Sequence, residues 1–243
     1  VGRAVWCGGE VAVTVGVLLL LLVVHQLWWT NRQARDGAER QVQALEQEWE
    51  SGAAGGGPTV APAPRPEDGE RDREQPAADH EQKPAADKPA APRWDQAYAV
   101  LSIPRLGVRV PVAEGVGKAG VLDKGYVGHY PRTAQPGRAG NFAVAGHRNT
   151  HGEPFRYVNR LRDGDRVEVR TRNATYTYTV DRRLAQTLPS DGGVIDPVPR
   201  SAVRPGAGYD ERGYYLTLTT CTPEFSSKYR LVVWGKLTSV AVR

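Results

Sequence analysis

The chain has 243 residues, of which 40% are hydrophobic and 24% charged, and its formal net charge at neutral pH is +5. This length suffices for one domain of ordinary size with additional segments, or for two small domains. The lysines and arginines are spread through mixed-sign stretches such as RDGDRVEVR instead of forming one basic block. The composition therefore argues against nucleic-acid binding, and a mild positive excess equally suits an anionic cell-envelope surface.

An apolar segment near the N-terminus, residues 11–29, reads VAVTVGVLLLLLVVHQLWW and carries no formal charge. At ~1.5 Å per residue a helix of this length just crosses a ~30 Å hydrocarbon core. The pair Trp28 and Trp29 suits the aromatic belt of a membrane interface. A cleaved signal peptide is the alternative, but no small-residue cleavage site follows. We expect residues 1–30 to form an N-terminal segment with an uncleaved transmembrane anchor.

The charges that flank this span bear on its orientation. Arg3 precedes it, whereas Arg32, Arg35 and Arg40 follow it, which weakly favours a cytoplasmic C-terminal part. Long domains, however, translocate largely regardless of flanking charge. We therefore predict a single-pass protein of the cell membrane with its C-terminal domain on the extracellular face.

Two segments with few large apolar residues follow the span. Residues 31–50, NRQARDGAERQVQALEQEWE, predict a polar helical stalk. Residues 51–93 are rich in Ala, Pro, Gly and charge, and such a composition cannot offset the entropy of ordering. We expect a disordered linker there. No functional role is predicted for the chain before about residue 93.

Residues 94–243 have a different character. Short runs rich in Val, Tyr and Thr, such as AYAVLSIP, DRVEVRT, ATYTYTV and YYLTLTTC, recur between Gly, Pro and Asn breaks. No long amphipathic helical pattern intervenes, so these runs predict an all-β barrel or sandwich. A short helix is expected near PFRYVNRL.

Cys221 is the only cysteine of this β domain, and it ends a strand-like run beside polar threonines. A buried cysteine that only fills space is one interpretation. An unpaired thiol outside the membrane is exposed to oxidation, however, which favours a chemical role. A thiol nucleophile then needs a base or cation to favour its thiolate, and hydrogen-bond donors for an anionic intermediate.

Three histidines and one arginine are candidate partners of Cys221. His147 ends the run NFAVAGH at the same kind of strand-end position, whereas His129 lies in a glycine-flanked loop and His151 in an expected exposed turn. Arg230 begins the closing strand, where a hairpin can bring it across from the cysteine.

These residues stand in motifs that resemble those of a known family. TLTTC at 217–221, followed by Arg230 in KYRLVVWG and preceded by AVAGHR at 143–148, resembles the signatures of the sortase family. The resemblance covers about residues 97–240. GHYPRTAQPGRAGNFAVAGHR and TLTTCTP are most similar to class E sortases of high-GC Gram-positive bacteria. The family implies an eight-stranded sortase β-barrel with short helices, here forming a catalytic domain over residues 94–243.

The resemblance also implies a cysteine transpeptidase mechanism. Cys221 would attack the threonine carbonyl of a C-terminal sorting signal and form a thioacyl intermediate. His147 would protonate the departing glycine amine and then deprotonate the incoming amine, while Arg230 would hold the substrate backbone or stabilise the oxyanion. The implied signal is L-A-x-T-G, with L-P-x-T-G as the alternative, on secreted proteins. The implied acceptor is an amine of peptidoglycan or of its lipid-linked precursor.

Further residues are candidates for substrate binding. Thr220 is next to the nucleophile, Tyr130 matches a tyrosine implied to help select the alanine of the signal, and His129 could line a cleft. The Pro/Gly-rich segment 189–206 would wall the signal groove. We expect no cofactor and no metal, because no acidic cluster matches the calcium site of class A members.

Three other functions remain open from the sequence. One is a membrane-tethered binding or scaffolding domain in which Cys221 is merely buried. An L,D-transpeptidase is disfavoured because those enzymes place histidine and cysteine in one short run, whereas His147 and Cys221 lie far apart in this chain. A hydrolytic cysteine peptidase would differ only in using water instead of an amine to resolve the intermediate.

Overall fold

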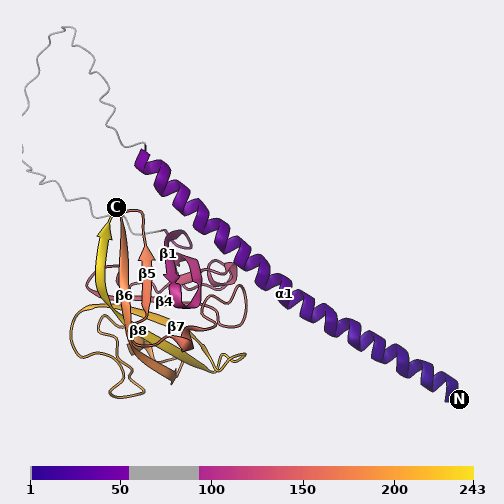
Figure 1. Ribbon diagram of the computed structural model, residues 1–243. Helices are drawn as coiled ribbons and strands as arrows, with labels where there is room; N and C mark the ends of the chain where they lie inside the picture. Colours follow the sequence, from indigo (N-terminus) through magenta and orange to yellow (C-terminus); the bar gives the residue numbers. More distant parts are fainter. Residues whose placement is uncertain (1, 55–92) are drawn as a thin grey trace, which may run out of the picture.

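The computed structural model describes residues 2–54 and 93–243, with side chains over 12–51 and 93–243 (Figure 1). The expected linker, residues 51–93, lies almost wholly outside the described residues.

The C-terminal part of the chain is a closed β-barrel with strand order β1-β2-β3-β4-β7-β8-β6-β5. Neighbouring strands are antiparallel except for the parallel pairs β2–β3 and β4–β7. The strands are β1 Ala97–Ile103, β2 Val108–Glu114, β3 Val127–His129, β4 Gly140–Ala145, β5 Arg166–Arg170, β6 Ala174–Thr187, β7 Tyr214–Thr222 and β8 Tyr229–Val242. The barrel confirms the predicted fold class. The strand-like runs alone are compatible with a barrel or a sandwich, and the pairing of the strands distinguishes the two.

Four single-turn 3₁₀ helices join the strands: η1 Pro104–Leu106, η2 Leu122–Lys124, η3 Val158–Arg160 and η4 Gly192–Ile195. The short helix expected near PFRYVNRL corresponds to η3. The second of them, η2, carries an acidic side chain that reaches the candidate site.

The barrel is filled by alternate residues of its strands, as the period of two in their sequences requires. Leu101 on β1, Phe142 on β4 and Leu218 on β7 are all at most 1% exposed and belong to one interior cluster. Full burial of a side chain of this size stabilises the fold by ~1.5–3 kcal/mol. The interior cluster therefore fixes the ends of β4 and β7 relative to one another.

The outer face of β7 is also covered, because the segment between β6 and β7 folds back over it. Thr217 Oγ1 and Trp234 Nε1 both donate to the carbonyl of Val194 in η4, at 3.3 and 3.1 Å. Asp191 accepts bonds from the hydroxyl of Ser201 and from the backbone N–H of Ala202. The predicted loop thus lies over the barrel as a fixed wall.

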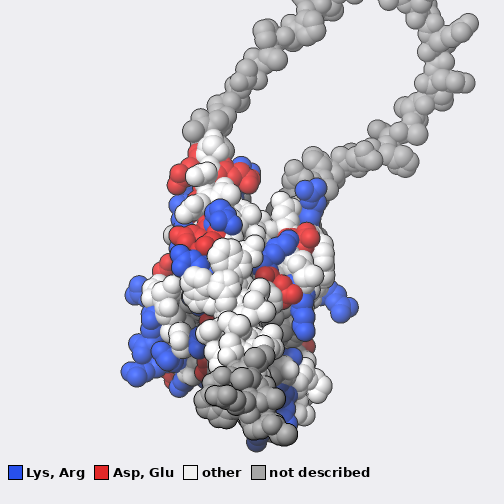
Figure 2. All heavy atoms as spheres, turned by 90° about the vertical axis from the view of Figure 1, so that its right-hand side faces the viewer, with Lys and Arg blue, Asp and Glu red and all other residues white. Residues whose placement is uncertain are grey.

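In the described part of the chain, one long helix, α1 Gly2–Ala54, precedes the barrel. Within it, Ala12–Ser51 contains an 18-residue window of mean hydropathy 2.0 with no buried residue, so by length and composition this helix can cross a membrane. Figure 1 shows its N-terminal part extending away from the barrel. On the face of the molecule that Figure 2 shows, residues without charge form a white band, and blue and red charged residues lie interspersed beside it.

The C-terminal half of α1 packs against the barrel instead of standing apart from it. Ala38, Val42, Leu45 and Trp49 are buried at a helical spacing, and the last three belong to an apolar cluster shared with strands β1 and β2. Glu46 adds ion pairs to Arg109 of β2 and Arg170 of β5. The sequence predicts the stalk helix, but its docking is a finding of the structure.

The start of the stalk holds the loop that follows β4. Asn31 Nδ2 and Arg35 Nη2 donate to the two carboxylate oxygens of Glu153, at 3.0 and 2.9 Å. Arg35 Nε also donates to the carbonyl of Gly152 at 3.0 Å. Because this loop carries two of the site histidines, the stalk takes part in positioning them.

Candidate active site

Cys221 lies between two candidate partners, one on a neighbouring strand and one just past the end of the other neighbouring strand. Antiparallel pairing of β7 with β8 places it directly opposite Arg230. Parallel pairing of β4 with β7 aligns Ala145 with Thr219, so the chain that continues past β4 brings His147 level with Cys221. Adjacent strands are ~4.7–4.9 Å apart, and directly paired Cβ atoms ~4.5–5.5 Å. The structure therefore brings together the three residues predicted to be catalytic.

Cys221 is a free, half-buried thiol. By strand alternation it shares a face with Thr217 and Thr219, the outer face that the β6–β7 loop covers. Arg148, which is 8% exposed, donates from Nη1 to the carbonyl of Cys221 at 3.1 Å and to Thr222 Oγ1 at 2.9 Å. The backbone of the cysteine is thus held by the guanidinium of Arg148, a residue of the AVAGHR motif for which the sequence predicts no role.

His147 is positioned by close packing just before it. A Cβ on Gly146 would lie 2.7 Å from the ring of the buried Phe155, so only glycine allows this approach. The N–H of Phe155 donates back to the carbonyl of His147 at 3.0 Å, which closes the loop. His147 Nε2 lies 2.8 Å from Asp123 Oδ1.

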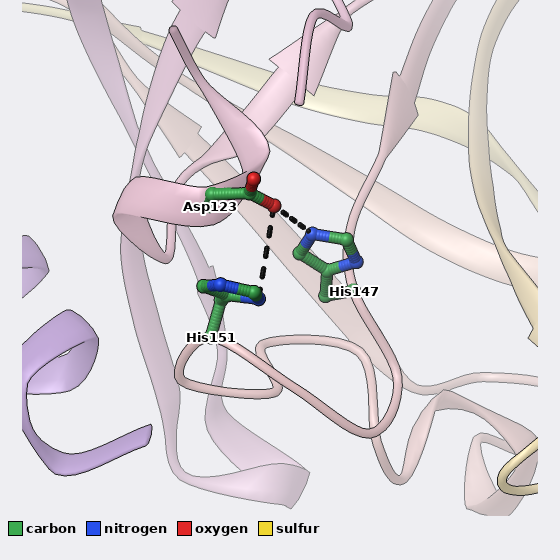
Figure 3. Close-up of side chains that lie close together, drawn as sticks. All are labelled: Asp123, His147 and His151. Carbon is green, nitrogen blue, oxygen red and sulfur yellow. Dashed lines mark hydrogen bonds and ion pairs between the residues drawn. The ribbon is translucent and has the colours of Figure 1, made fainter. Parts of the chain in front are cut away.

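Asp123 stands in η2 and directs its carboxylate toward two imidazole rings, as Figure 3 shows. Besides its hydrogen bond with His147 Nε2, its Oδ1 lies 3.7 Å from Nδ1 of His151. Such a carboxylate fixes the ring orientation and the tautomer of the histidine that donates to it. Sequence reasoning missed Asp123, since a surface-type LDKG segment far upstream gives no signal of this contact.

His151 stacks on His147, with ring centroids 5.2 Å apart and an interplanar angle of 29°. Its backbone φ of +51° is uncommon for a residue other than glycine, and the neighbouring N–H of Gly152 is bonded to Asn31 of the stalk. The side chain is 32% exposed and its Nδ1 is buried without a hydrogen bond. The residue expected in an exposed turn is therefore part of the cluster around Asp123.

Arg230 turns its guanidinium partly back onto its own hairpin. Nη1 donates to the carbonyls of Ser227 and Tyr229 at 2.9 and 3.0 Å. These two bonds use one of the three guanidinium nitrogens. The guanidinium is thus held in a fixed orientation by its own hairpin, with donors left for a further acceptor.

Two of the predicted substrate-binding residues lie next to the strand ends. Thr220 is buried, and its Oγ1 donates to the carbonyl of Gly146 at 2.8 Å, which ties β7 to the segment that carries His147. The Tyr130 hydroxyl lies 3.0 Å from Thr219 Oγ1, two residues before Cys221 on the same face. Thr220 thus contacts the scaffold, whereas Tyr130 reaches the outer face.

The third, His129, lies inside the wall of the barrel and is fully buried. Its Nδ1 lies 2.7 Å from Glu114 Oε2 and 3.0 Å from the Tyr98 hydroxyl. Its Nε2 lies 2.9 Å from Thr133 Oγ1 and 3.1 Å from the carbonyl of Ala134. Burial, with the nearby Glu114 carboxylate, raises the pKa of Tyr98 well above its ordinary value. The structure does not bring His129 to Cys221.

A cavity of about 370 Å³ lies over the start of β4, at the opposite end of this strand from His147. It is lined by Thr133 and Asn141 on one side and by Ile195 and Pro197 of the β6–β7 loop on the other. Its volume falls within the ~300–1,000 Å³ of small-ligand pockets.

Comparison with known proteins agrees with this architecture. The sequence model of the sortase domain matches residues 101–238. The chain is 42% identical over 234 residues to sortase SrtE1 of Streptomyces coelicolor, an alignment that covers 94% of this chain and 56% of that relative. The chain therefore spans little more than half the length of that relative.

Solved structures show the same likeness. A crystal structure of sortase E1 from Streptomyces coelicolor, described with a tripeptide in its active site, matches with a TM-score of 0.58 at 49% identity, covering 63% of this chain and 94% of that one. Sortase E from Streptomyces avermitilis matches with a TM-score of 0.55 at 44% identity, covering 62% and 93%. The chain belongs to the sortase family of cysteine transpeptidases, and within it resembles the class E members.

Proposed function

We propose that this protein is a membrane-anchored transpeptidase that cleaves a C-terminal sorting signal between threonine and glycine and joins the new threonine carboxyl end to an amine of the cell wall. One observation carries the proposal above the others. Cys221 stands at a strand end, with Arg230 paired to it on β8 and His147 two residues past the end of β4 on its other side.

Each of the three groups has a distinct role in the proposed reaction. The Cys221 thiolate attacks the threonine carbonyl, which becomes an oxyanion and then a thioester as the glycine amine leaves. His147 gives that amine its proton through Nδ1 and later removes one from the incoming amine, while Asp123 holds the ring through Nε2. Arg230 donates to the oxyanion or to the substrate backbone from its remaining guanidinium nitrogens.

The groove for the signal peptide would run along the outer face of β4 and β7. The β6–β7 loop walls it on one side, and Tyr130 reaches it through Thr219. By the resemblance to class E members, we infer that the signal is L-A-x-T-G, with L-P-x-T-G as the second candidate. The acceptor would be an amine of peptidoglycan or of its lipid-linked precursor, and the anchor would hold the barrel at the extracellular face of the cell membrane.

The proposal is tested with the full chain in detergent micelles and two fluorogenic peptides, one with L-A-x-T-G and one with L-P-x-T-G. Each peptide is incubated with and without oligoglycine as the amine, and the products are identified by mass spectrometry. We expect a ligated product that requires the amine, and faster turnover of the alanine peptide. Cleavage with no ligated product would instead identify a hydrolytic peptidase. If neither peptide is turned over and Cys221 is inert to alkylation, the result would favour the alternative of a binding domain with a buried cysteine.

A further inference from the structure

The cluster of Asp123, His147 and His151 presents three metal-binding atoms to one point. A carboxylate oxygen and two imidazole nitrogens, one from each residue, all lie within 4.8 Å of one another. Figure 3 shows one carboxylate oxygen of Asp123 facing both rings. Mixed nitrogen and oxygen donors suit zinc and its neighbours among the transition metals, whereas calcium and magnesium prefer oxygen alone.

The spacing of these atoms is close to that of a tetrahedral site. Metal–ligand bonds of ~2.0–2.1 Å require ligand atoms ~3.3–3.4 Å apart. The distances from Asp123 Oδ1 are 2.8 Å to His147 Nε2 and 3.7 Å to His151 Nδ1, so they lie on either side of this value. Shifts of about half an ångström bring both distances to this value, and the two nitrogens lie within 4.8 Å of one another.

A second observation points to a ligand at this place. His151 Nδ1 is buried and makes no hydrogen bond, although Asp123 lies 3.7 Å away. A buried polar atom without a partner is costly, and a bound cation is one group that satisfies it. The three side chains are 18–33% exposed, so an ion can reach them from solvent.

We propose that Asp123, His147 and His151 form an inhibitory site for a divalent transition-metal ion, with zinc as its representative occupant. Binding replaces the proton on His147 Nε2 and breaks the hydrogen bond to Asp123. The ion on Nε2 leaves a proton on Nδ1 that the imidazole no longer exchanges at neutral pH, so His147 ceases to act as acid and base.

The inhibition rests on the proposed role of His147, whereas the binding does not, and the test separates them. Zinc binding is first measured by isothermal titration calorimetry on the full chain carrying Cys221→Ala, which removes the thiol as a competing ligand. We expect one equivalent to bind. Adding His151→Ala should weaken the affinity at least about tenfold, the loss expected when support of a metal site is removed. Adding His25→Ala, on α1 outside the cluster, should leave the affinity unchanged.

Activity is measured in parallel on chains that keep Cys221. Zinc should inhibit the wild type. With the activity of each chain expressed relative to its own metal-free rate, His151→Ala should raise the half-inhibitory zinc concentration at least about tenfold over the wild type. Absorption of bound Co²⁺ in the Cys221→Ala chain reports tetrahedral coordination even where the His151 variant folds poorly. Binding that is lost with Cys221→Ala, or an affinity unaltered by His151→Ala in the folded chain, would overturn the proposal. Binding without inhibition would retain the metal site and refute the role of His147.

Discussion

At the scale of single residues, the candidate site depends on contacts that hold its groups from outside. Arg148 bonds the carbonyl of Cys221, and Asp123 bonds the ring of His147. Neither contact involves the reactive atom itself. Preorganisation of this kind lowers the cost of reaching the transition state, because the groups need not reorient during the reaction.

Arg230 gives the first prediction. Arg230→Ala should lower kcat/KM by about 10²–10³, the usual loss when one oxyanion donor is removed. Arg230→Lys keeps the charge but not the planar fork of donors, so its kcat/KM should fall between those of the wild type and of Arg230→Ala. Steady-state kinetics with the sorting-signal peptides measure the effect, and circular dichroism checks the fold. An alanine variant within twofold of the wild type would remove Arg230 from the mechanism.

His129 gives a prediction about stability instead of chemistry. His129→Ala leaves the partly buried Glu114 and Tyr98 with fewer partners, and each unsatisfied group costs ~1–3 kcal/mol if it stays out of contact with water. The two groups together cost ~2–6 kcal/mol, and at ~2–4 °C per kcal/mol for a domain of this size the melting temperature should fall by about 4–24 °C. Calorimetry measures this shift. A variant with unchanged melting temperature but impaired substrate binding would instead place His129 in the groove, as the sequence suggests.

The sequence predicts some of these residues and not others for a physical reason. Cys221, His147 and Arg230 stand in short motifs, and their strand-end positions follow from local pattern. Asp123 and Arg148 act through neighbours that only the folded barrel supplies. The stacking of His151 on His147 likewise depends on the left-handed backbone conformation of His151, which no local sequence pattern predicts.

At the scale of elements, the stalk of α1 is an integral part of the described barrel's surface. Its sequence predicts a polar helix, yet alanines, Val42, Leu45 and Trp49 form one apolar stripe among the charges. That stripe is short and diluted, so composition alone does not reveal that it is buried. A barrel cut at about residue 93 would expose the apolar surface of Val100 and Val121.

Gly125 tests this docking. A Cβ there would lie 2.9 Å from the carbonyl of Ala34 in the stalk, and φ is +81°. Gly125→Ala should therefore loosen the stalk and raise amide hydrogen exchange between residues 31 and 49. Gly107→Ala is the matched control, because φ is +63° there but nothing lies within 4 Å. Equal exchange in the two variants would show that backbone strain alone, and not the contact with the helix, is responsible.

At the scale of the whole molecule, one helix joins a membrane-length apolar segment to a helix face docked beside the candidate site. The arrangement would hold the site at a fixed height and orientation above a bilayer. The resemblance to the family predicts an eight-stranded barrel, but local sequence patterns do not predict the order of its strands. This order includes a parallel pair, β4 and β7, whose strands are distant in the sequence.

The predicted topology is tested in intact cells that produce the full chain. The protein should remain in the membrane after carbonate extraction, and removal of residues 1–30 should release it. External protease should digest the barrel before lysis, since the barrel is expected on the extracellular face. Protection of the barrel until the cells are lysed would reverse the orientation and agree with the flanking charges of Arg32, Arg35 and Arg40.

Whether Cys221 carries the acyl group is measured by intact-mass spectrometry of the full chain incubated with the L-A-x-T-G peptide. We expect an adduct of the peptide's N-terminal fragment on Cys221, which disappears as ligated product forms when an amine is added. Cys221→Ala should show neither adduct nor turnover while keeping the fold. Turnover by Cys221→Ala, or an adduct on any other residue, would rule out Cys221 as the nucleophile.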